Sequence, residues 1–142
     1  MDTSTERSIV YCADLIVRCG IGSPRRGFVI IERVADGGGL ALPGGKQEPG
    51  EQLSQPALRE LTEETGLIGS IISTFGTFAE RDRDPRGDFI STVFVVNARG
   101  TLRGEAGKTK PLVMTQSEIE QRSSDFMFDH ALILEQFFNL RK

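Results

Sequence analysis

The chain has 142 residues, which suits one domain with enough length to bury a hydrophobic core. Its formal net charge of −3 gives no reason to expect a basic surface for nucleic acid. No apolar run approaches the roughly 20 residues that a membrane-spanning helix needs, and the polar first segment is unlike a signal peptide. We therefore expect a cytoplasmic protein that binds neither nucleic acid nor membranes.

The apolar patterns and turn formers predict a disordered tail at residues 1–7 and one domain over residues 8–142. Strands are expected at 8–19, 27–33, 40–43, 68–76 with a continuation to 81, 88–97 and 111–115. Between them we expect turns at 20–26, 35–39 and 81–87, and a mobile glycine-rich loop at 98–110. Cys12 and Cys19 would lie about 23 Å apart on the first strand, too far for a disulfide, so they are interpreted as reduced packing residues.

The first helix should run from about Leu53 to Thr65 and end at Gly66, which suits the residue after a helix. Pro56 is tolerable only in the first turn, so we expect either that Ser54 lies near the N-cap or that the first turn is distorted. One face carries an apolar stripe that would pack on a sheet: Leu53, Ala57 and Leu61.

Two further helices are predicted near the C-terminus. Ser117 is expected to cap a short helix that begins at Glu118, and Asp129 to cap a last helix from His130 to Leu140. Apolar residues wrap more than one side of that last helix, which predicts a homodimer. Strands on both sides of a central helix, with a helix at the end, indicate a mixed sheet between helices.

The first helix also carries a cluster of carboxylates. Glu60, Glu63 and Glu64 stand at i, i+3 and i+4, so they share one helical face. Such close carboxylates raise one another's pKa values unless something positive lies between them. A hard divalent cation would serve, with Mg²⁺ fitting best and Mn²⁺ as an alternative. A solvated acidic face paired with Arg59 is the other interpretation.

Residues 45–67 resemble the Nudix box of the Nudix hydrolase superfamily, in which G, E, R-E-U, E-E and G-U stand at fixed spacings and U is aliphatic. Every specified position is filled, by Gly45, Glu51, Arg59, Glu60, Leu61, Glu63, Glu64, Gly66 and Leu67. The resemblance implies an α/β fold, the α/β/α sandwich with a mixed central sheet. It also implies an enzyme that hydrolyses a nucleoside diphosphate linked to another moiety.

The resemblance implies roles for individual residues. Glu60 and Glu64, one helical turn apart, are the first-choice metal ligands, with Glu63 as a third ligand or a group acting through water. Gly44 would supply a backbone carbonyl to the metal. Mg²⁺ would screen the phosphate oxygens and lower the pKa of its bound water. Arg59 would pair with Glu51 and orient the loop and the helix.

The general base is left open between two glutamates. Glu105, on the loop at 98–110, could swing over bound substrate and accept the proton of the attacking water. The alternatives are that Glu105 is an ordinary exposed loop residue and that Glu64 takes the proton.

Residues 78–96, FAERDRDPRGDFISTVFVV, resemble a segment that follows the box in ADP-ribose pyrophosphatases, and residues 126–130 resemble the opening of their last helix. The implied reaction converts ADP-ribose to AMP and ribose 5-phosphate. Arg83 and Arg86 are then candidate phosphate contacts, because guanidinium groups bind phosphate in a bidentate way. A plain charged turn is the alternative. Arg33 and Gly45 complete the candidate substrate-binding residues.

Three points leave the function open. Leu40 stands where the family usually has an aromatic residue, and His130, the only histidine, is interpreted as a locally hydrogen-bonded helix-start residue rather than a catalytic base. The alternative substrates are a modified nucleoside triphosphate or another nucleotide sugar. A non-catalytic, ADP-ribose-sensing domain is the third possibility, but such regulators carry a DNA-binding domain for which we see no room, and the intact glutamates favour catalysis.

Overall fold

In this computed structural model the described residues are 8–20, 27–34, 38–84 and 87–140, with only the backbone described at residue 8 and at 80–84 and 87. The strands are β1 Ser8–Cys19, β2 Gly27–Arg33, β3 Leu40–Ala41, β4 Gly44–Lys46, β5 Ile68–Asp84, β6 Gly87–Arg99 and β7 Thr109–Met114. The helices are α1 Ser54–Thr65, α2 Gln116–Gln121 and α3 His130–Leu140, with a short 3-10 turn at Ser123–Asp125. The predicted tail at 1–7 lies outside the described residues.

The strands join in one mixed sheet in the order β3-β2-β1-β6-β5, and β4 and β7 pair with β1 and β2 respectively. β1 runs parallel to β6 from Ser8 to Arg18, whereas its pairings with β2 and β4 are antiparallel. The predicted mixed sheet is therefore confirmed. β1 lies at the centre, and both β4 and β2 pair with it, at residues 12–14 and 18–19.

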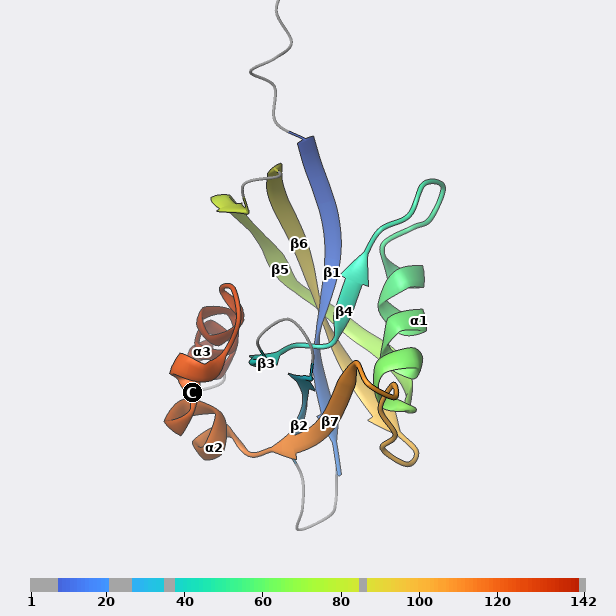
Figure 1. Cartoon of the computed structure of the whole chain (residues 1–142), viewed down its shortest axis with the longest axis vertical. Helices are drawn as coiled ribbons and strands as arrows, with labels where there is room; N and C mark the ends of the chain where they lie inside the picture. Colours follow the sequence, from blue (N-terminus) through green and yellow to red (C-terminus); the bar gives the residue numbers. More distant parts are fainter. Residues whose placement is uncertain (1–7, 21–26, 35–37, 85–86, 141–142) are drawn as a thin grey trace, which may run out of the picture.

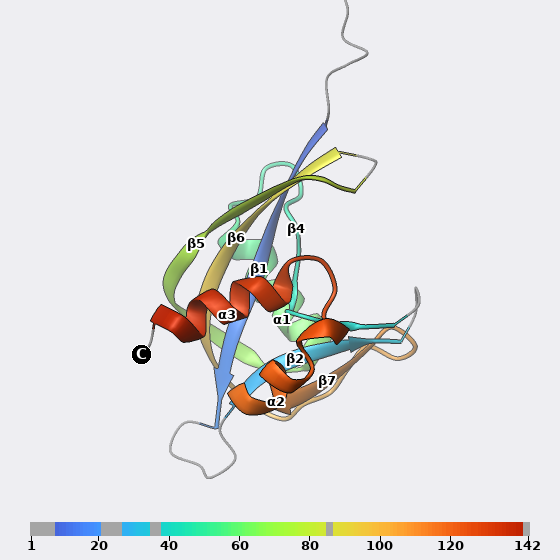
Figure 2. The same ribbon diagram turned by 90° about the vertical axis from the view of Figure 1, so that its left-hand side faces the viewer.

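Helices cover both faces of the sheet, as Figures 1 and 2 show, with α1 on one face and α2 and α3 on the other. The alternation of β1 explains why both faces are apolar: Leu15 and Val17 belong to the core under α1, and Ile16 to the core under α3. All three side chains are fully buried. The predicted α/β/α sandwich is confirmed.

Helix α1 forms nearly where the sequence predicts it. Ala57 and Leu61 are buried in the core and Leu53 packs against it, which confirms the predicted stripe. Gly66 ends the helix in the left-handed region, with φ of 76°, and its N–H is bonded to the Thr62 carbonyl. Ser54 lies next to the N-cap, as predicted, because the N-cap is Leu53, and no side chain caps the helix.

Other local predictions need correction. The expected turn at 81–87 is largely strand, because β5 continues to Asp84 and β6 begins at Gly87. Ser117 does not cap α2; Thr115 does, in a capping box with Glu118. The expected loop at 98–110 is shortened at both ends by β6 and β7.

Within the described part of the chain, the structure also bears on disulfides and on membrane-spanning helices. Neither Cys12 nor Cys19 forms a disulfide among the described residues, as predicted. None of the described helices is long and apolar enough to cross a membrane.

Candidate functional site

The site is built where β4 passes the C-terminal half of α1. The N–H of Gly44 donates to Glu64 Oε1 at 3.0 Å, so the strand and the helix are joined by a direct hydrogen bond. Gly45 lies so close to α1 that a Cβ there would stand 2.5 Å from Cγ of Glu60. The box thus needs glycine at this position because any side chain would displace Glu60.

Glu64 lies in an environment that favours its neutral form. Burial raises its pKa to about 8, and the charges of Glu60 and Glu105 add to the rise. The Gly44 N–H bond and the positive charge of Arg33 offset part of this effect. Three acidic side chains from two separate segments therefore face one another closely enough to interact electrostatically.

The neighbouring glutamates differ in exposure and in partners. Burial and the charge of Glu63 raise the pKa of Glu60, and Arg59 opposes them. Arg59 lies 3.1 Å from Glu60 and 3.4 Å from Glu51, so the predicted pairing of Arg59 with Glu51 is present. Glu63 is half exposed and lies 3.9 Å from Arg59, which places it at the rim of the cluster.

Glu105 reaches this cluster on a segment that is tied to α1. Its N–H donates to Oγ1 of Thr109, and the Thr109 hydroxyl in turn donates to the Glu64 carbonyl at 3.3 Å. A second backbone bond joins Arg103 to Thr65 at 2.7 Å. The expected free loop is thus anchored to the helix, and Glu105 is held half-buried beside it.

The residues present suit a hard divalent cation by their chemistry. Glu60, Glu64 and Glu105 offer carboxylate oxygens, and burial together with neighbouring carboxylate charge raises the pKa values of Glu60 and Glu64. As the side chains stand, no three acidic, histidine or cysteine residues in the described ranges converge closely enough to hold an ion. Glu60 is turned to Arg59 and Glu64 to Gly44, so holding an ion would require these side chains to turn.

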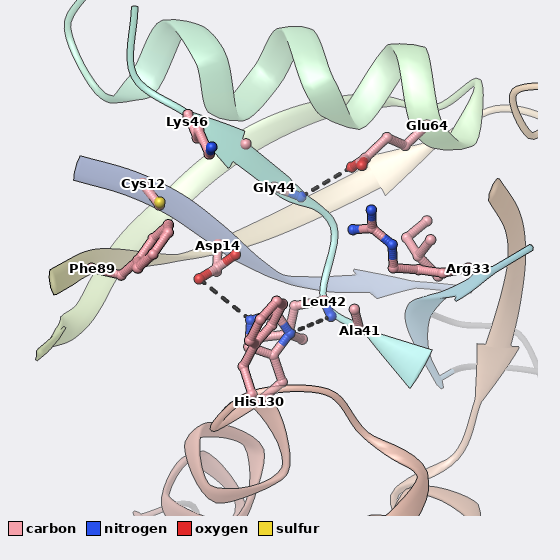
Figure 3. Close-up of a pocket in the computed structure, with 13 residues that line it drawn as sticks. Cys12, Asp14, Arg33, Ala41, Leu42, Gly44, Lys46, Glu64, Phe89 and His130 are labelled. Atoms are coloured by element: carbon pink, nitrogen blue, oxygen red, sulfur yellow. Dashed lines mark hydrogen bonds and ion pairs between the residues drawn. The ribbon is translucent and has the colours of Figure 1, made fainter. Parts of the chain in front are cut away.

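A cavity of about 310 Å³ opens beside this cluster, a volume in the range of small-ligand sites. Figure 3 shows Glu64, Arg33 and Lys46 around it, with Asp14 and His130 opposite. Its lining also includes aromatic and small residues, and the full set is Cys12, Asp14, Ile31, Arg33, Ala41, Leu42, Gly44, Gly45, Lys46, Glu64, Phe89, Phe128 and His130. Acidic and basic groups thus share one hollow, as binding of a charged ligand with a cation would require.

Of the four candidate substrate-binding residues, two line the cavity and two have side chains that lie outside the described part. Arg33 and Gly45 line the cavity with Glu64. Arg83 lies on β5 with its side chain outside the described part, and Arg86 is wholly outside the described residues. The phosphate-binding role of both arginines therefore stays a prediction.

Several lining residues were not anticipated from the sequence. Lys46 lies 5.9 Å from the ring centre of Phe89, and Phe128 is half exposed at the cavity. The only sequence feature that could have indicated these lining residues was their position within or next to the predicted motifs. His130 begins α3 as predicted, but the expected local bonding is wrong, because Nδ1 accepts from the N–H of Leu42, 88 residues away.

Comparison with known proteins places these features in a family. The family model described as the NUDIX domain matches residues 16–135. A curated relative, the ADP-ribose pyrophosphatase of Methanocaldococcus jannaschii, is 48% identical over 63 residues. That alignment covers 44% of this chain and 37% of the relative, so it spans little more than a third of the relative's length.

Solved structures share the fold at low identity. The NUDIX domain of Shewanella oneidensis NrtR, complexed with ADP-ribose, aligns with a TM-score of 0.80 and 20% identity over 100% of this chain and 94% of that one. A bifunctional NMN adenylyltransferase/ADP-ribose pyrophosphatase from Francisella tularensis, complexed with AMP and a Mn ion, aligns with a TM-score of 0.77 and 20% identity. That match covers 96% of this chain and 43% of the other. At such identities the similarity concerns the fold.

Proposed function

This chain belongs to the Nudix hydrolase family, and from that premise we propose that it hydrolyses the pyrophosphate of ADP-ribose to AMP and ribose 5-phosphate with Mg²⁺. The observation that carries the proposal is that Glu64, the buried member of the box's acidic cluster, lines a cavity that Arg33 also lines. The 48% identity over 63 residues to the ADP-ribose pyrophosphatase of Methanocaldococcus jannaschii supports the choice of substrate.

The carboxylates would hold the cation. Glu60 and Glu64 are the proposed ligands, Glu63 a third ligand or a group acting through water, and the Gly44 carbonyl a fourth contact. The bound ion would neutralise phosphate charge and supply an acidified water as nucleophile. Because Glu64 is buried, ionising it without such a counter-charge is unfavourable, and this makes its environment suited to a cation. Mn²⁺ is the proposed substitute.

The residues around the cluster would position the substrate and move the proton. Arg33 lies beside Glu64 at the cavity and can pair with a phosphate oxygen, while Gly45 allows the ligand to approach the backbone. Arg83 and Arg86 are proposed to contact the phosphate or the ribose. Glu105 is the proposed general base because it is near Glu60 and Glu64, and Glu64 is the alternative. Arg59 and Glu51 would hold the box loop against α1.

A panel of substrates tests the proposal. With Mg²⁺, kcat/KM for ADP-ribose should exceed the values for other nucleotide sugars and for modified nucleoside triphosphates. A higher value for one of the latter would assign the chain to the second proposed function, a Nudix pyrophosphatase of different specificity. Binding of ADP-ribose without hydrolysis would favour a non-catalytic sensor.

The wider setting is also proposed rather than observed. We propose one Nudix domain over residues 8–142, with residues 1–7 as a tail, that acts as a homodimer in the cytoplasm without binding nucleic acid or membranes. Within the chain, Ile133, Leu134, Phe137 and Phe138 of α3 are buried, whereas Leu132 and Leu140 are exposed at 51% and 76%. The proposed dimer would therefore have to rest on this narrower exposed side of α3.

A further inference from the structure

Buried polar side chains are few in the described part of the chain, and they are not scattered. Asp14, Thr65, Ser91 and His130 are the buried polar or charged residues there. The Thr65 hydroxyl is bonded within α1, to the Leu61 carbonyl. The other three, from β1, β6 and the start of α3, are close together beside the cavity. Burying polar groups is unfavourable unless they are partnered, so their gathering calls for a reason.

The three residues form a continuous network, part of which Figure 3 shows. The Ser91 hydroxyl donates to Oδ2 of Asp14. Nε2 of His130 lies 3.6 Å from the same oxygen, within ion-pair range though longer than a hydrogen bond. On its other side, Nδ1 of His130 accepts the N–H of Leu42 at 2.9 Å. Because Nδ1 is an acceptor, the ring proton stands on Nε2 and faces Asp14.

The network ends on the segment that leads into the acidic cluster. After Leu42, the Pro43 carbonyl accepts from Leu15 N–H at 2.8 Å, and Gly44 donates to Glu64 at 3.0 Å. Gly44 also stands opposite Asp14 in the pairing of β1 with β4. His130 thus holds the chain two residues before the glycine that contacts Glu64.

The turn before α3 has a strained backbone where it delivers His130. Phe128 has φ of 57°, the one positive value among the described residues other than glycine. The N–H of Met127 bonds the Leu40 carbonyl at 2.8 Å, which fixes this turn beside the same segment. A bulky residue keeps such a conformation only where its surroundings impose it, and such strain concentrates at functional sites.

We propose that Ser91, Asp14 and His130 are positioning residues that hold residues 42–44 against α1 and thereby set the divalent-cation affinity of the site. The inference rests on the proposed function for the role of the cation, but its test does not need substrate. Partners that orient metal ligands commonly change metal affinity by about 10-fold to 100-fold when they are removed. His130 acts through the backbone and touches neither the cation nor the reacting atoms in this account.

Two substitutions at His130 distinguish the role of Nδ1, which accepts from Leu42, from that of Nε2, which faces Asp14. In His130→Asn the side-chain oxygen can occupy the place of Nδ1 and still accept from Leu42 N–H. In His130→Gln the longer side chain reaches toward Asp14 and leaves the Leu42 N–H without its acceptor. Ile133→Val, a buried change on the same helix outside the network, controls for loss of packing.

The measurement is the dissociation constant for Mn²⁺, followed by electron paramagnetic resonance on the substrate-free protein. His130→Gln should weaken Mn²⁺ binding about tenfold, while His130→Asn should stay within about threefold of wild type. Ile133→Val should bind Mn²⁺ as wild type does. With ADP-ribose, the Mg²⁺ concentration for half-maximal rate should rise in the same order while kcat at saturating Mg²⁺ changes little.

The outcomes distinguish this inference from the proposed function. A folded His130→Gln protein that binds Mn²⁺ as tightly as wild type overturns the positioning role, whether or not ADP-ribose is hydrolysed. If the order of affinities holds but no variant hydrolyses ADP-ribose, the substrate proposal fails and the network stands. Should His130→Gln not fold, Ser91→Ala must weaken Mn²⁺ binding, or the inference fails. A wild type that binds no Mn²⁺ overturns both.

Discussion

Glu64→Gln should make the metal-free protein more stable at neutral pH and change little in acid. Burial raises the pKa of Glu64 from an ordinary value of 4.5 to about 8, so the folded chain keeps a proton that the unfolded chain releases. The carboxyl therefore contributes its full stability below pH 4.5, and that stability is lost as the pH rises to about 8. Glutamine, which has nearly the same shape and no charge, has no such dependence.

The size of the effect follows from the two pKa values. Each pH unit between them changes the free energy of unfolding by at most about 1.4 kcal/mol. Between about pH 5.5 and 7.5 wild type should therefore lose roughly 3 kcal/mol relative to Glu64→Gln, as an upper estimate because the ionisation of Glu64 is coupled to that of Glu60.

Urea unfolding in EDTA, followed by far-ultraviolet circular dichroism at the two pH values, measures this difference. Glu120→Gln, an exposed change on α2, is the matched control and should show a constant difference from wild type. Adding Mg²⁺ at pH 7.5 should raise the free energy of unfolding of wild type more than that of Glu64→Gln. If wild type and Glu64→Gln keep the same separation at both pH values, Glu64 ionises normally and the description of its environment is wrong.

Three further predictions concern the proposed machinery and assembly. Glu105→Gln should lower kcat for ADP-ribose by about 10²-fold or more while KM and Mg²⁺ affinity stay close to wild type, since only proton transfer is lost; an unchanged kcat returns the base to Glu64. Alanine at Arg83 or Arg86 should raise KM for ADP-ribose while the free energy of unfolding changes little, and wild-type kinetics in both variants would contradict a substrate-binding role for these arginines. Light scattering at micromolar protein should give a mass near twice 15.6 kDa, whereas 15.6 kDa itself would count against the homodimer.

Local signals sufficed for the elements whose determinants are adjacent in sequence. Helix α1 has its apolar stripe, its early Pro56 and the terminating Gly66 within one short stretch, and it forms nearly as predicted. The pairing of Arg59 with Glu51 was likewise predictable from the box. Ser54 lies next to its N-cap as predicted, whereas the cap of α2 is Thr115 and not the predicted Ser117. Serine and threonine are both good capping residues, and the choice between them depends on how the chain enters the helix.

Features that depend on contacts between residues far apart in the sequence could not be predicted from local sequence patterns. The extension of β5 to Asp84 comes from its pairing with β6, which the residues near Asp84 do not indicate by themselves. The electrostatic effect of Glu105 on Glu60 and Glu64 depends on the bond between Thr109 and the Glu64 carbonyl, 45 residues apart in sequence. His130 had a clear place at the start of α3, but nothing nearby in sequence indicates that its partner is Leu42.

The most direct test of the central claim follows ADP-ribose and its products by phosphorus NMR, with Mg²⁺ and with EDTA. Wild type and Glu120→Gln should convert ADP-ribose to AMP and ribose 5-phosphate with Mg²⁺ alone, and Glu60→Gln or Glu64→Gln should slow that conversion by orders of magnitude. The claim is contradicted if ADP-ribose persists with wild type and Mg²⁺, or if both box variants hydrolyse it at near the wild-type rate.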